Sequence, residues 1–542
     1  MRPFWLAACL LLISPLPSLG QEIPEPRGTY ALEGAYLKED IFPYVWLRFG
    51  MDLHGIGIKT SAVVSEDKFV MVWKPSFRGN RRRLVSCFDS KAKLLWESEL
   101  NISNNENLIY IFAQDGMVNL LSYRFDPQTR AHQILAHRYE AQEGEYISSQ
   151  TLFMVIGDRV EPVGFNFSPD GQQILLYVFE NQVKRPSITQ LTQFPLGEWN
   201  LGQKITNVSH LRFVRLSRNF DTLQSATFPI DVWLREKSYA LDCQLDNAGN
   251  IYVPVFKRPE ALRIVQFDAS LNESREMVFQ PYPDPFNDPP YDARLVPEVG
   301  NNGSIFAVTA KRVKNRGKKE IESLQVIEFD FDHMRLDQKR YVEITSGFRV
   351  KVAKEREAVK LRPNVPFDHY EIREVIELPD QSLWVVTQRY LKNRQLEYIN
   401  GVQAATSFDT RHEDIILYEF SPEGKVQKAI IIPVIQRAEN LRERMTRNYQ
   451  LNVFPDRMRI DMITREAPSG KPYKAPMLYK RSINLKDGTF TGPYPIYDGR
   501  RRDQYHVPTY TAWLNESIAA LLLLDGEGEA IPKVVTVPLD RK

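Results

Sequence analysis

Three short clusters in the sequence carry the oxygen and nitrogen atoms that bind cations or transfer protons. One is Asp330–His333, which reads DFDH, and another is Arg411–Asp414, which reads RHED. The third is a set of aspartates in a proline-rich segment: Asp284, Asp288 and Asp292. Carboxylate oxygens are the usual ligands of Ca2+, and an imidazole exchanges a proton near neutral pH. Metal binding and acid–base chemistry are therefore the first possibilities to weigh.

A structural role explains each cluster more simply. Asp330–His333 falls where a strand is expected to end, so we expect its side chains in a solvated turn. Arg411–Asp414 mixes both signs of charge, which favours an exposed salt-bridge cluster. The three aspartates lack the alternating spacing and the turn glycine of the familiar calcium loop. We therefore predict no catalytic, metal-binding or cofactor-binding residue and no cofactor.

Motifs typical of common active sites do not occur in the sequence. It contains no Gly-x-Ser-x-Gly, no His-Glu-x-x-His, no Cys-x-x-Cys and no glycine-rich phosphate loop. The eight histidines are scattered singly. The sequence thus points to an architecture more clearly than to a reaction.

The N-terminus has the plan of a secretory signal peptide spanning residues 1–20. Arg2 precedes an apolar run from Phe4 to Ile13, prolines break the run, and small residues lead to a cleavage site between Gly20 and Gln21. The run is too short to anchor the chain in a bilayer, and no later stretch approaches transmembrane length. We therefore expect an exported protein of the periplasm, the cell envelope or the extracellular space, with no transmembrane segment in its mature chain.

The charge balance argues against two classes of partner. The 70 Lys and Arg residues nearly balance the 68 Asp and Glu residues, so no net field attracts nucleic acid or an anionic membrane. The basic runs Arg81–Arg83 and Arg500–Arg502 are short, and we expect them to be solvated loop charges. The expected partner is a protein, peptide or glycan ligand, and the expected oligomeric state is a monomer.

One pattern recurs along the chain. In Phe167–Val178 (FSPDGQQILLYV), a Ser-Pro-Asp-Gly turn leads into an apolar run. Related turns before apolar runs begin at Val64, Phe112, Leu245, Val299, Leu378, Phe454 and Leu514. A second turn, preceded by an aromatic residue and Asp or Ser, follows most of them, as in Phe88–Glu97. Asp and Asn bond their own backbone and Gly accepts positive φ, so both kinds of turn favour tight hairpins.

The repeating unit is therefore strand, turn, strand, loop, strand, turn, strand, found about eight times. Several strands are apolar on consecutive residues, as in Ile174–Phe179, which indicates burial on both faces. We predict an all-β fold, a β-propeller of seven to eight four-stranded antiparallel blades. A pair of β-sandwich domains is the alternative, but the fixed order of the two turns favours the propeller.

The domain organisation follows from this repeat. After the signal peptide we expect an N-terminal segment (21–55), whose strand Tyr44–Gly50 closes the ring with the C-terminal strands. Residues 56–542 form a single propeller domain. Its repeats are more widely spaced than compact blades, so we expect long inserted loops at 311–322, 351–371 and 389–414. Apolar residues at helical spacing predict a short helix near 434–449.

The cysteines provide a check on the ring order. Cys9 leaves with the signal peptide, whereas Cys87 and Cys243 fall in units far apart around the ring. Their Cα atoms would lie well beyond the roughly 7 Å limit for a disulfide. We predict two free, buried thiols.

Two stretches resemble repeats of known families. Phe167–Gly171, with the two glutamines and the strand that follow, resembles the WD40-like repeat of Tol-B-type bacterial propellers, and Phe420–Lys425 resembles it more weakly. Phe88–Glu97 is similar to the strand-turn-strand of quinoprotein-type repeats, in which Trp follows the turn. That Trp does not recur at equivalent positions, so a quinone cofactor is not implied. These resemblances imply a β-propeller fold and not an activity.

Two functions remain open at this point. The first is a non-catalytic propeller in the cell envelope or outside the cell, which binds ligands or other proteins as a scaffold through its loops or channel mouth. The second is an envelope or extracellular glycan-active enzyme, which would need two carboxylates about 5–10 Å apart in a pocket at the channel.

Overall fold

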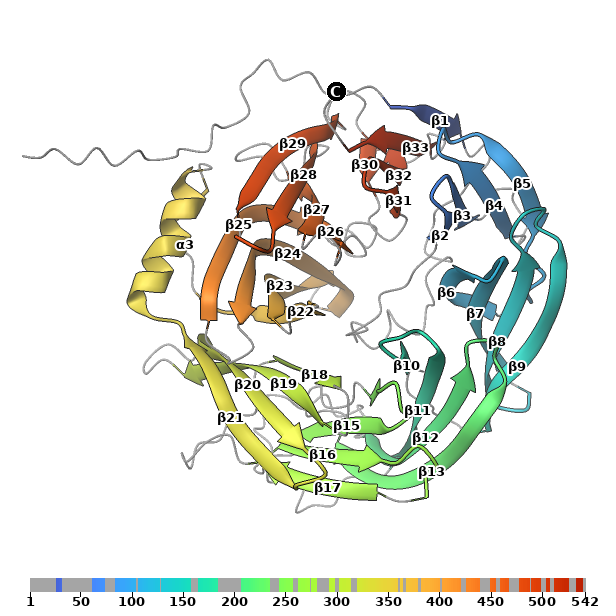
Figure 1. Cartoon of the computed structure of the whole chain (residues 1–542), viewed down its shortest axis with the longest axis horizontal. Coiled ribbons are helices and arrows are strands. Elements are labelled where there is room, and N and C mark those ends of the chain that lie inside the picture. Colours follow the sequence, from blue (N-terminus) through green and yellow to red (C-terminus); the bar gives the residue numbers. More distant parts are fainter. Residues whose placement is uncertain are drawn as a thin grey trace, which may run out of the picture.

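Eight β-sheets follow one another around a ring in the computed structural model (Figure 1). In seven of these sheets, or blades, four consecutive strands pair antiparallel in chain order. The chain is therefore an eight-bladed β-propeller and not a pair of sandwiches. The structure describes residues 26–31, 61–73, 83–103, 106–126, 128–156, 164–183, 206–233, 243–256, 262–272, 274–279, 292–297, 302–312, 319–358, 361–363, 367–378, 382–399, 402–420, 426–438, 449–454, 459–466, 477–487, 489–498, 504–506, 511–525 and 533–539.

Each of blades 1 to 7 takes its strands in order from the innermost to the outermost. Blades 1 to 4 consist of β2 (Ser61–Ser65), β3 (Lys68–Trp73), β4 (Leu84–Asp89), β5 (Leu94–Glu99), β6 (Glu106–Gln114), β7 (Met117–Asp126), β8 (Ala131–Glu140), β9 (Tyr146–Ile156), β10 (Gly164–Phe167), β11 (Gln173–Val183), β12 (Thr206–Ser217), β13 (Thr222–Trp233), β14 (Gln244–Leu245), β15 (Ile251–Phe256), β16 (Leu262–Phe267) and β17 (Ser274–Phe279). Blades 5 to 7 consist of β18 (Asp292–Pro297), β19 (Asn302–Arg312), β20 (Lys319–Asp330), β21 (Arg335–Glu343), β22 (Tyr370–Glu377), β23 (Leu383–Ile399), β24 (Val402–Phe420), β25 (Val426–Ala438), β26 (Tyr449–Phe454), β27 (Arg459–Glu466), β28 (Met477–Asn484) and β29 (Phe490–Asp498).

Blade 8 joins the two ends of the chain. It combines β30 (Gln504–His506), β31 (Ala512–Asn515), β32 (Ile518–Asp525) and β33 (Lys533–Pro538) with β1 (Gly28–Ala31). β1 pairs antiparallel with β33 and places Thr29 opposite Val535. Closure of the ring by N- and C-terminal strands is therefore confirmed, with Gly28–Ala31 as the closing strand. The candidate Tyr44–Gly50 lies outside the described residues.

The Ser-Pro-Asp-Gly stretch forms the tight turn between β10 and β11, as its residue types predict. The Ser168 hydroxyl donates to Asp170 Oδ1 at 2.5 Å, and the Gln172 amide donates to the same oxygen at 3.0 Å. Gly171 has a φ of 68°, in the left-handed region that costs glycine little. Beyond this turn, Ile174, Leu175 and Leu176 are all buried because neighbouring blades cover both faces of β11.

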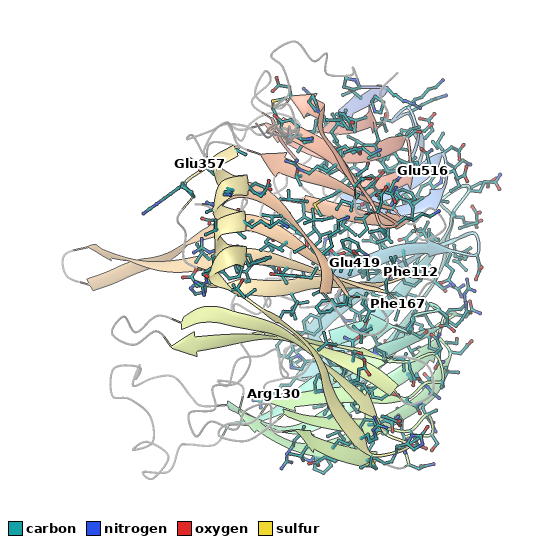
Figure 2. All side chains as sticks on the ribbon, turned by 60° about the vertical axis from the view of Figure 1, so that its left-hand side comes forward. Phe112, Arg130, Phe167, Glu357, Glu419 and Glu516 are labelled. Atoms are coloured by element: carbon teal, nitrogen blue, oxygen red, sulfur yellow. The ribbon has the colours of Figure 1, made fainter. Side chains whose placement is uncertain are left out.

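The two ends of the ring differ. In a four-stranded antiparallel meander, the first and third connections lie at one end, while the second connection and the link to the next blade lie at the other. The two repeated kinds of tight turn therefore share one end, which we call the turn face. The long connections share the opposite end, which we call the insertion face. In Figure 2, α3 and two projecting hairpins lie on the side of Glu357, away from Phe112, Phe167 and Glu516 near the tight turns.

The segments predicted as three inserted loops differ in structure from that expectation. The described residues of 311–322 and 389–414 are strand: they extend the β19–β20 and β23–β24 hairpins, whose register continues to Arg312↔Lys319 and Ile399↔Val402. The link between blades 5 and 6, expected as a loop at 351–371, contains the helix α3 (Ser346–Ala358). The helix expected near 434–449 is wrong in its first part, because Val434–Ala438 belongs to β25 and pairs with the extended β24. Residues 439–448 lie outside the described residues.

The core lies between the blades. Clusters of buried apolar side chains fill the interfaces, and each combines members from neighbouring sheets; one of them extends across blades 3, 4 and 5. At about 25 cal/mol per Å2 of apolar surface removed from water, these interfaces dominate the stability of the ring. Within the described ranges, no helix has the length and apolar character needed to cross a bilayer.

Candidate functional site

A buried ionic cluster lies at the insertion end of blade 6. It joins Arg356 of α3, Arg389 of β23, and Glu413 and Asp414 of β24 to Asp368, which precedes β22. Arg356 Nη1 lies 2.5 Å from Asp414 Oδ1. Arg389 donates to Asp368 Oδ1 through Nη2 at 2.5 Å and through Nε at 3.0 Å, and its Nη1 donates to Glu413. We refer to these five residues as the blade 6 cluster.

The blade 6 cluster corrects the prediction for Arg411–Asp414. Glu413 is 4% exposed and Asp414 is fully buried, so these two acids do not form an exposed salt-bridge cluster. A register shift explains how two consecutive side chains are buried: Gln388 pairs with Ile415 but Arg389 pairs with Glu413, which leaves Asp414 as the extra residue of a β-bulge. Bulges redirect side chains in this way.

Every carboxylate of the blade 6 cluster is held by an arginine. Burial lowers the pKa of Arg389, but the Glu413 and Asp368 carboxylates outweigh it and raise that pKa above its usual value. Arg356 also donates from Nε to the carbonyl of Arg362 at 2.8 Å. Burial raises the pKa of Tyr370, whose hydroxyl lies 3.5 Å from Asp414 Oδ2, well above 10. The arrangement fixes α3 and the base of the β23–β24 hairpin to one blade.

A second buried polar cluster lies in blade 2 and faces blade 1. Glu106 on β6 accepts a hydrogen bond from Ser122 on β7 and lies 2.5 Å, through Oε1, from His137 Nε2 on β8. The Ser122 hydroxyl is 3.1 Å from the same nitrogen. Burial raises the pKa of Glu106, but the hydrogen bonds to His137 and Ser122 outweigh it and hold that pKa below its usual value.

This Ser, His and Glu set does not have the geometry of a nucleophilic triad. In a triad, the serine and the acid contact different nitrogens of the imidazole. Here both contact Nε2, and Nδ1 of His137 has no hydrogen-bond partner. All three residues are at most 2% exposed. The cluster therefore serves the packing of blade 2 against blade 1.

Arg83 belongs to the same polar contact, and the prediction that it is a solvated loop charge is wrong. Its Nη1 donates to the carbonyl of Glu106 at 2.6 Å, and the side chain is only 9% exposed. It is therefore an inter-blade contact and not a solvated loop charge. Arg81, Arg82 and Arg500–Arg502 lie outside the described residues.

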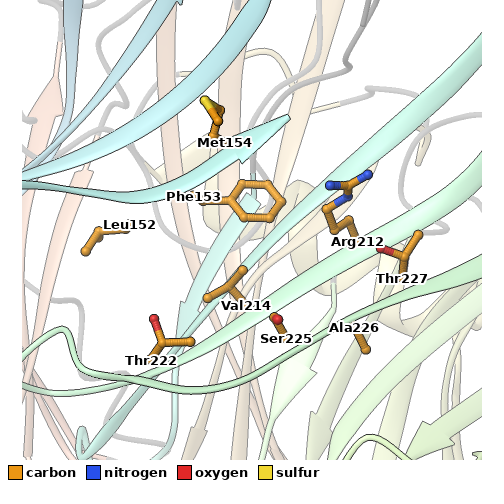
Figure 3. Close-up of a pocket in the computed structure, with 9 residues that line it drawn as sticks. All are labelled: Leu152, Phe153, Met154, Arg212, Val214, Thr222, Ser225, Ala226 and Thr227. Atoms are coloured by element: carbon orange, nitrogen blue, oxygen red, sulfur yellow. The ribbon is translucent and has the colours of Figure 1, made fainter. Parts of the chain in front are cut away.

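A cavity of about 370 Å3 opens between blades 2 and 3 (Figure 3). Phe153 and Met154 of β9 line one side, and Arg212, Val214 and Thr222 of β12 and β13 line the other. Its lining includes no carboxylate, and Arg212 is the charged residue in it. This site can accept a side chain or a small ligand but lacks an acid–base pair.

The remaining sequence candidates do not assemble a site. Asp330–His333 forms the turn between β20 and β21, where His333 Nδ1 lies 2.6 Å from Asp330 Oδ2 and its side chain is 75% exposed. Hydrogen bonds from the His333 amide and imidazole hold the pKa of Asp330 below its usual value. Asp284 and Asp288 lie outside the described residues, and Asp292 begins β18. Across the described ranges, no three His, Cys, Asp or Glu residues converge on a possible metal position.

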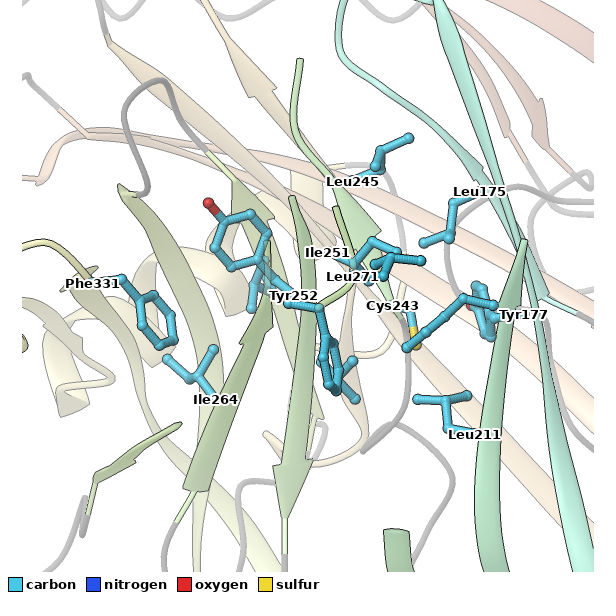
Figure 4. Packing of buried hydrophobic residues seen from close by; sticks show 14 of the residues in the cluster. Leu175, Tyr177, Leu211, Cys243, Leu245, Ile251, Tyr252, Ile264, Leu271 and Phe331 are labelled. Carbon is cyan, nitrogen blue, oxygen red and sulfur yellow. The ribbon is translucent and has the colours of Figure 1, made fainter. Parts of the chain in front are cut away.

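Cys87 and Cys243, the cysteines among the described residues, are buried and form no disulfide, as predicted. Burial raises the pKa of Cys87 to about 12. Cys243 packs among Leu175, Tyr177 and Leu211 in the cluster between blades 3 and 4 (Figure 4). The placement of the two thiols in blades 1 and 4 agrees with the ring order.

Comparisons with known proteins relate the chain only to solved structures. No protein-family model matches it, and no curated protein sequence matches it. The polysaccharide lyase Uly1 aligns over 96% of this chain and 99% of its own, with a TM-score of 0.39 and 10% identity. The BP39L lectin from Burkholderia pseudomallei aligns over 82% and 100%, with a TM-score of 0.34 and 10% identity. TolB from Acinetobacter baumannii aligns over 85% and 78%, with a TM-score of 0.26 and 9% identity. These similarities assign no ligand or reaction to this chain.

Proposed function

We propose that this protein is an exported, non-catalytic binding scaffold whose protein, peptide or glycan ligand binds the insertion face. The observation that carries the proposal is the asymmetry of the ring. Tight turns close one end, whereas α3 and the extended β19–β20 and β23–β24 hairpins stand at the other. Binding residues are commonly found on such projecting segments over a rigid frame.

The blade 6 cluster supports this proposal by fixing the projecting elements. Arg356 holds α3 to Asp414, and Arg389 holds the base of the β23–β24 hairpin to Asp368 and Glu413. Segments that are already ordered lose less conformational entropy when they bind a partner. An anchored hairpin is therefore better suited to recognition than a free loop of the same length.

A glycan-active enzyme is the second possibility, and the charges of the blade 6 cluster weigh against it at that position. A glycosidase needs one carboxylic acid and one carboxylate that reach the substrate. The three carboxylates of the cluster instead pair with Arg356 and Arg389, and their side chains are at most 11% exposed. Such pairing suits an anchor better than acid–base catalysis.

The test compares the mature chain with a variant whose β23–β24 hairpin is shortened. Residues 393–409 are replaced by Asn-Gly, which joins the register pair Lys392 and Thr410 through a two-residue turn. Both proteins are applied to glycan and peptide arrays, and equal thermal midpoints check that the frame is intact. Glu143→Lys on the turn face is the control, because Glu143 lies in the turn between β8 and β9.

We expect the parent chain and Glu143→Lys to bind the same array features and the shortened variant to lose them. If the parent chain binds no feature of either array, the proposed binding function is wrong. Binding that survives the shortening of both the β23–β24 and the β19–β20 hairpins would place the ligand elsewhere. Release of new reducing ends or unsaturated sugars from array glycans would favour the enzyme.

A further inference from the structure

The two faces of the ring carry opposite charge. In the described tight turns of the turn face, eleven acidic side chains are exposed or partly exposed, among them Asp67, Asp115, Asp170 and Glu516, against four basic ones. The described links at the insertion face show the reverse. There the exposed and partly exposed charges are the basic residues Arg130, Arg349, Lys351, Lys354 and Arg362 and the acids Glu355 and Glu357.

The β19–β20 hairpin, which projects from the insertion face (Figure 2), adds to this charge. Residues 311–319 include the end of β19 and the start of β20 and read KRVKNRGKK, with six Lys or Arg residues and no acid. The balance of 70 basic and 68 acidic residues in the whole chain therefore hides a separation of charge that the fold creates.

The length of the strands keeps the two charged faces apart. β3, β4 and β5 have six residues each, which at about 3.3 Å per residue separates the two faces by roughly 20 Å. The Debye length at physiological ionic strength is about 8 Å. The acidic turn face therefore does not cancel the positive potential of the insertion face, which attracts anions.

The distribution of the basic residues indicates the shape of the partner. Arg130 belongs to blade 2, the β19–β20 hairpin belongs to blade 5, and Lys354 lies on α3 between blades 5 and 6. A polymer with a charge on each repeat can contact several of these positions at once and gains affinity by doing so. A protein interface commonly has an apolar centre, whereas α3 exposes one large apolar side chain, Val350.

We propose that the ligand of the insertion face is an acidic glycan, an extended polysaccharide with repeated carboxylate or sulfate groups. This inference rests on the proposed function and narrows its ligand to one chemical class. Lysine and arginine cations form charge-assisted hydrogen bonds with such anions. Exposed ion pairs are individually weak, so the affinity depends on several contacts made together and falls as salt screens them.

Binding of the mature chain to immobilised polymers tests the inference. Polygalacturonate presents carboxylates, dextran sulfate presents sulfates, dextran is the neutral control, and polyglutamate presents carboxylates on a peptide. We expect the chain to bind at least one of the two acidic polysaccharides, and to bind dextran and polyglutamate at least about tenfold more weakly. Raising the salt from about 50 to about 500 mM should weaken the binding at least about tenfold.

Two double variants locate the binding charge. Lys354→Glu/Arg362→Glu reverses two exposed charges at the insertion face and should weaken binding to the acidic polysaccharide at least about fivefold. Lys91→Glu/Lys486→Glu is the matched control, because it changes the net charge by the same amount at exposed positions of the turn face. It should leave the affinity unchanged within about twofold. Equal thermal midpoints check that both variants are folded.

Four results would overturn the inference. Salt-insensitive binding that is as strong to dextran as to the acidic polysaccharides would show a neutral glycan ligand, and tighter binding to polyglutamate would show an acidic peptide. Either result would leave the binding scaffold standing. Equal weakening by the two double variants would mean that the net charge, and not the insertion face, sets the affinity. Absence of binding to all four polymers would also contradict the inference; the arrays described above then decide separately whether the scaffold binds another ligand.

Discussion

Replacing Arg356 by Met would remove the cation that neutralises Asp414 inside the blade 6 cluster. The two side chains are 1% and 0% exposed, so solvent does not screen the lost interaction. Unit charges about 4 Å apart attract by about 4 kcal/mol at an effective dielectric constant of about 20. Breaking a buried pair by removing one partner costs about 3–5 kcal/mol, because the other charge stays buried. We therefore expect Arg356→Met to destabilise the protein by about 4 kcal/mol.

The assay is urea unfolding followed by tryptophan fluorescence, with hydrogen exchange of α3 as a local readout. Arg356 links α3 to blade 6, so the amides of α3 should exchange faster in the variant. The double variant Arg356→Met/Asp414→Asn removes the stranded charge and should recover part of the stability. Lys354→Met, on the exposed side of the same helix, is the control and should change stability by less than about 0.5 kcal/mol.

Two results would refute this reasoning. One is a loss of less than about 1 kcal/mol in Arg356→Met, which would mean that the pair is not buried as described. The other is a double variant no more stable than the single variant, which would mean that the charge of Asp414 is not the source of the loss.

Three further predictions concern other parts of the ring. Despite burial, hydrogen bonds to His137 and Ser122 hold the pKa of Glu106 below its usual value. Its carboxylate therefore contributes stability above the pKa of the unfolded chain and loses that contribution as the pH falls through the lower folded-state pKa, so the stability difference between parent and Glu106→Gln should narrow in acid unfolding curves. Cys87 and Cys243 should react with a thiol reagent only after denaturation, since both are buried; rapid labelling of the native chain would contradict this. Gly144→Ala should lower the thermal midpoint more than Gly116→Ala. Both glycines have positive φ, which alone costs alanine about 1–2 kcal/mol, but only at Gly144 would the new Cβ also meet a tryptophan ring, at 2.3 Å. Equal losses of stability in the two variants would contradict this prediction.

The fold was predictable because its signals are local. Asp170 and Gly171 favour a tight turn through a hydrogen bond within the turn and a left-handed dihedral angle, and both signals can be read from the residue types themselves. The run from Ile174 to Leu176 indicates burial on both faces by composition alone. Repeated along the chain, these two signals were sufficient for the propeller.

The blade 6 cluster was not predictable from local pattern. The burial of Asp414 depends on a β-bulge and on Arg356, which is 58 positions away in the sequence. The helix that carries Arg356 was also missed, because only Val352 and Arg356 are buried in it and no apolar stripe marks it. Val434 and Ala438, at helical spacing, instead lie in β25, because the long hairpin offers Ile435–Ala438 backbone partners in β24. Tertiary context decides such segments.

A disulfide engineered between β1 and β33 tests the closure of the ring most directly. Thr29 and Val535 are register partners, so cysteines at these positions should lie within about 6 Å and form a disulfide under mild oxidation. The account predicts a product lighter by two hydrogens in intact-mass analysis, with a raised unfolding midpoint. A pair that stays reduced under conditions where the chain is folded would contradict closure of the ring by its two ends.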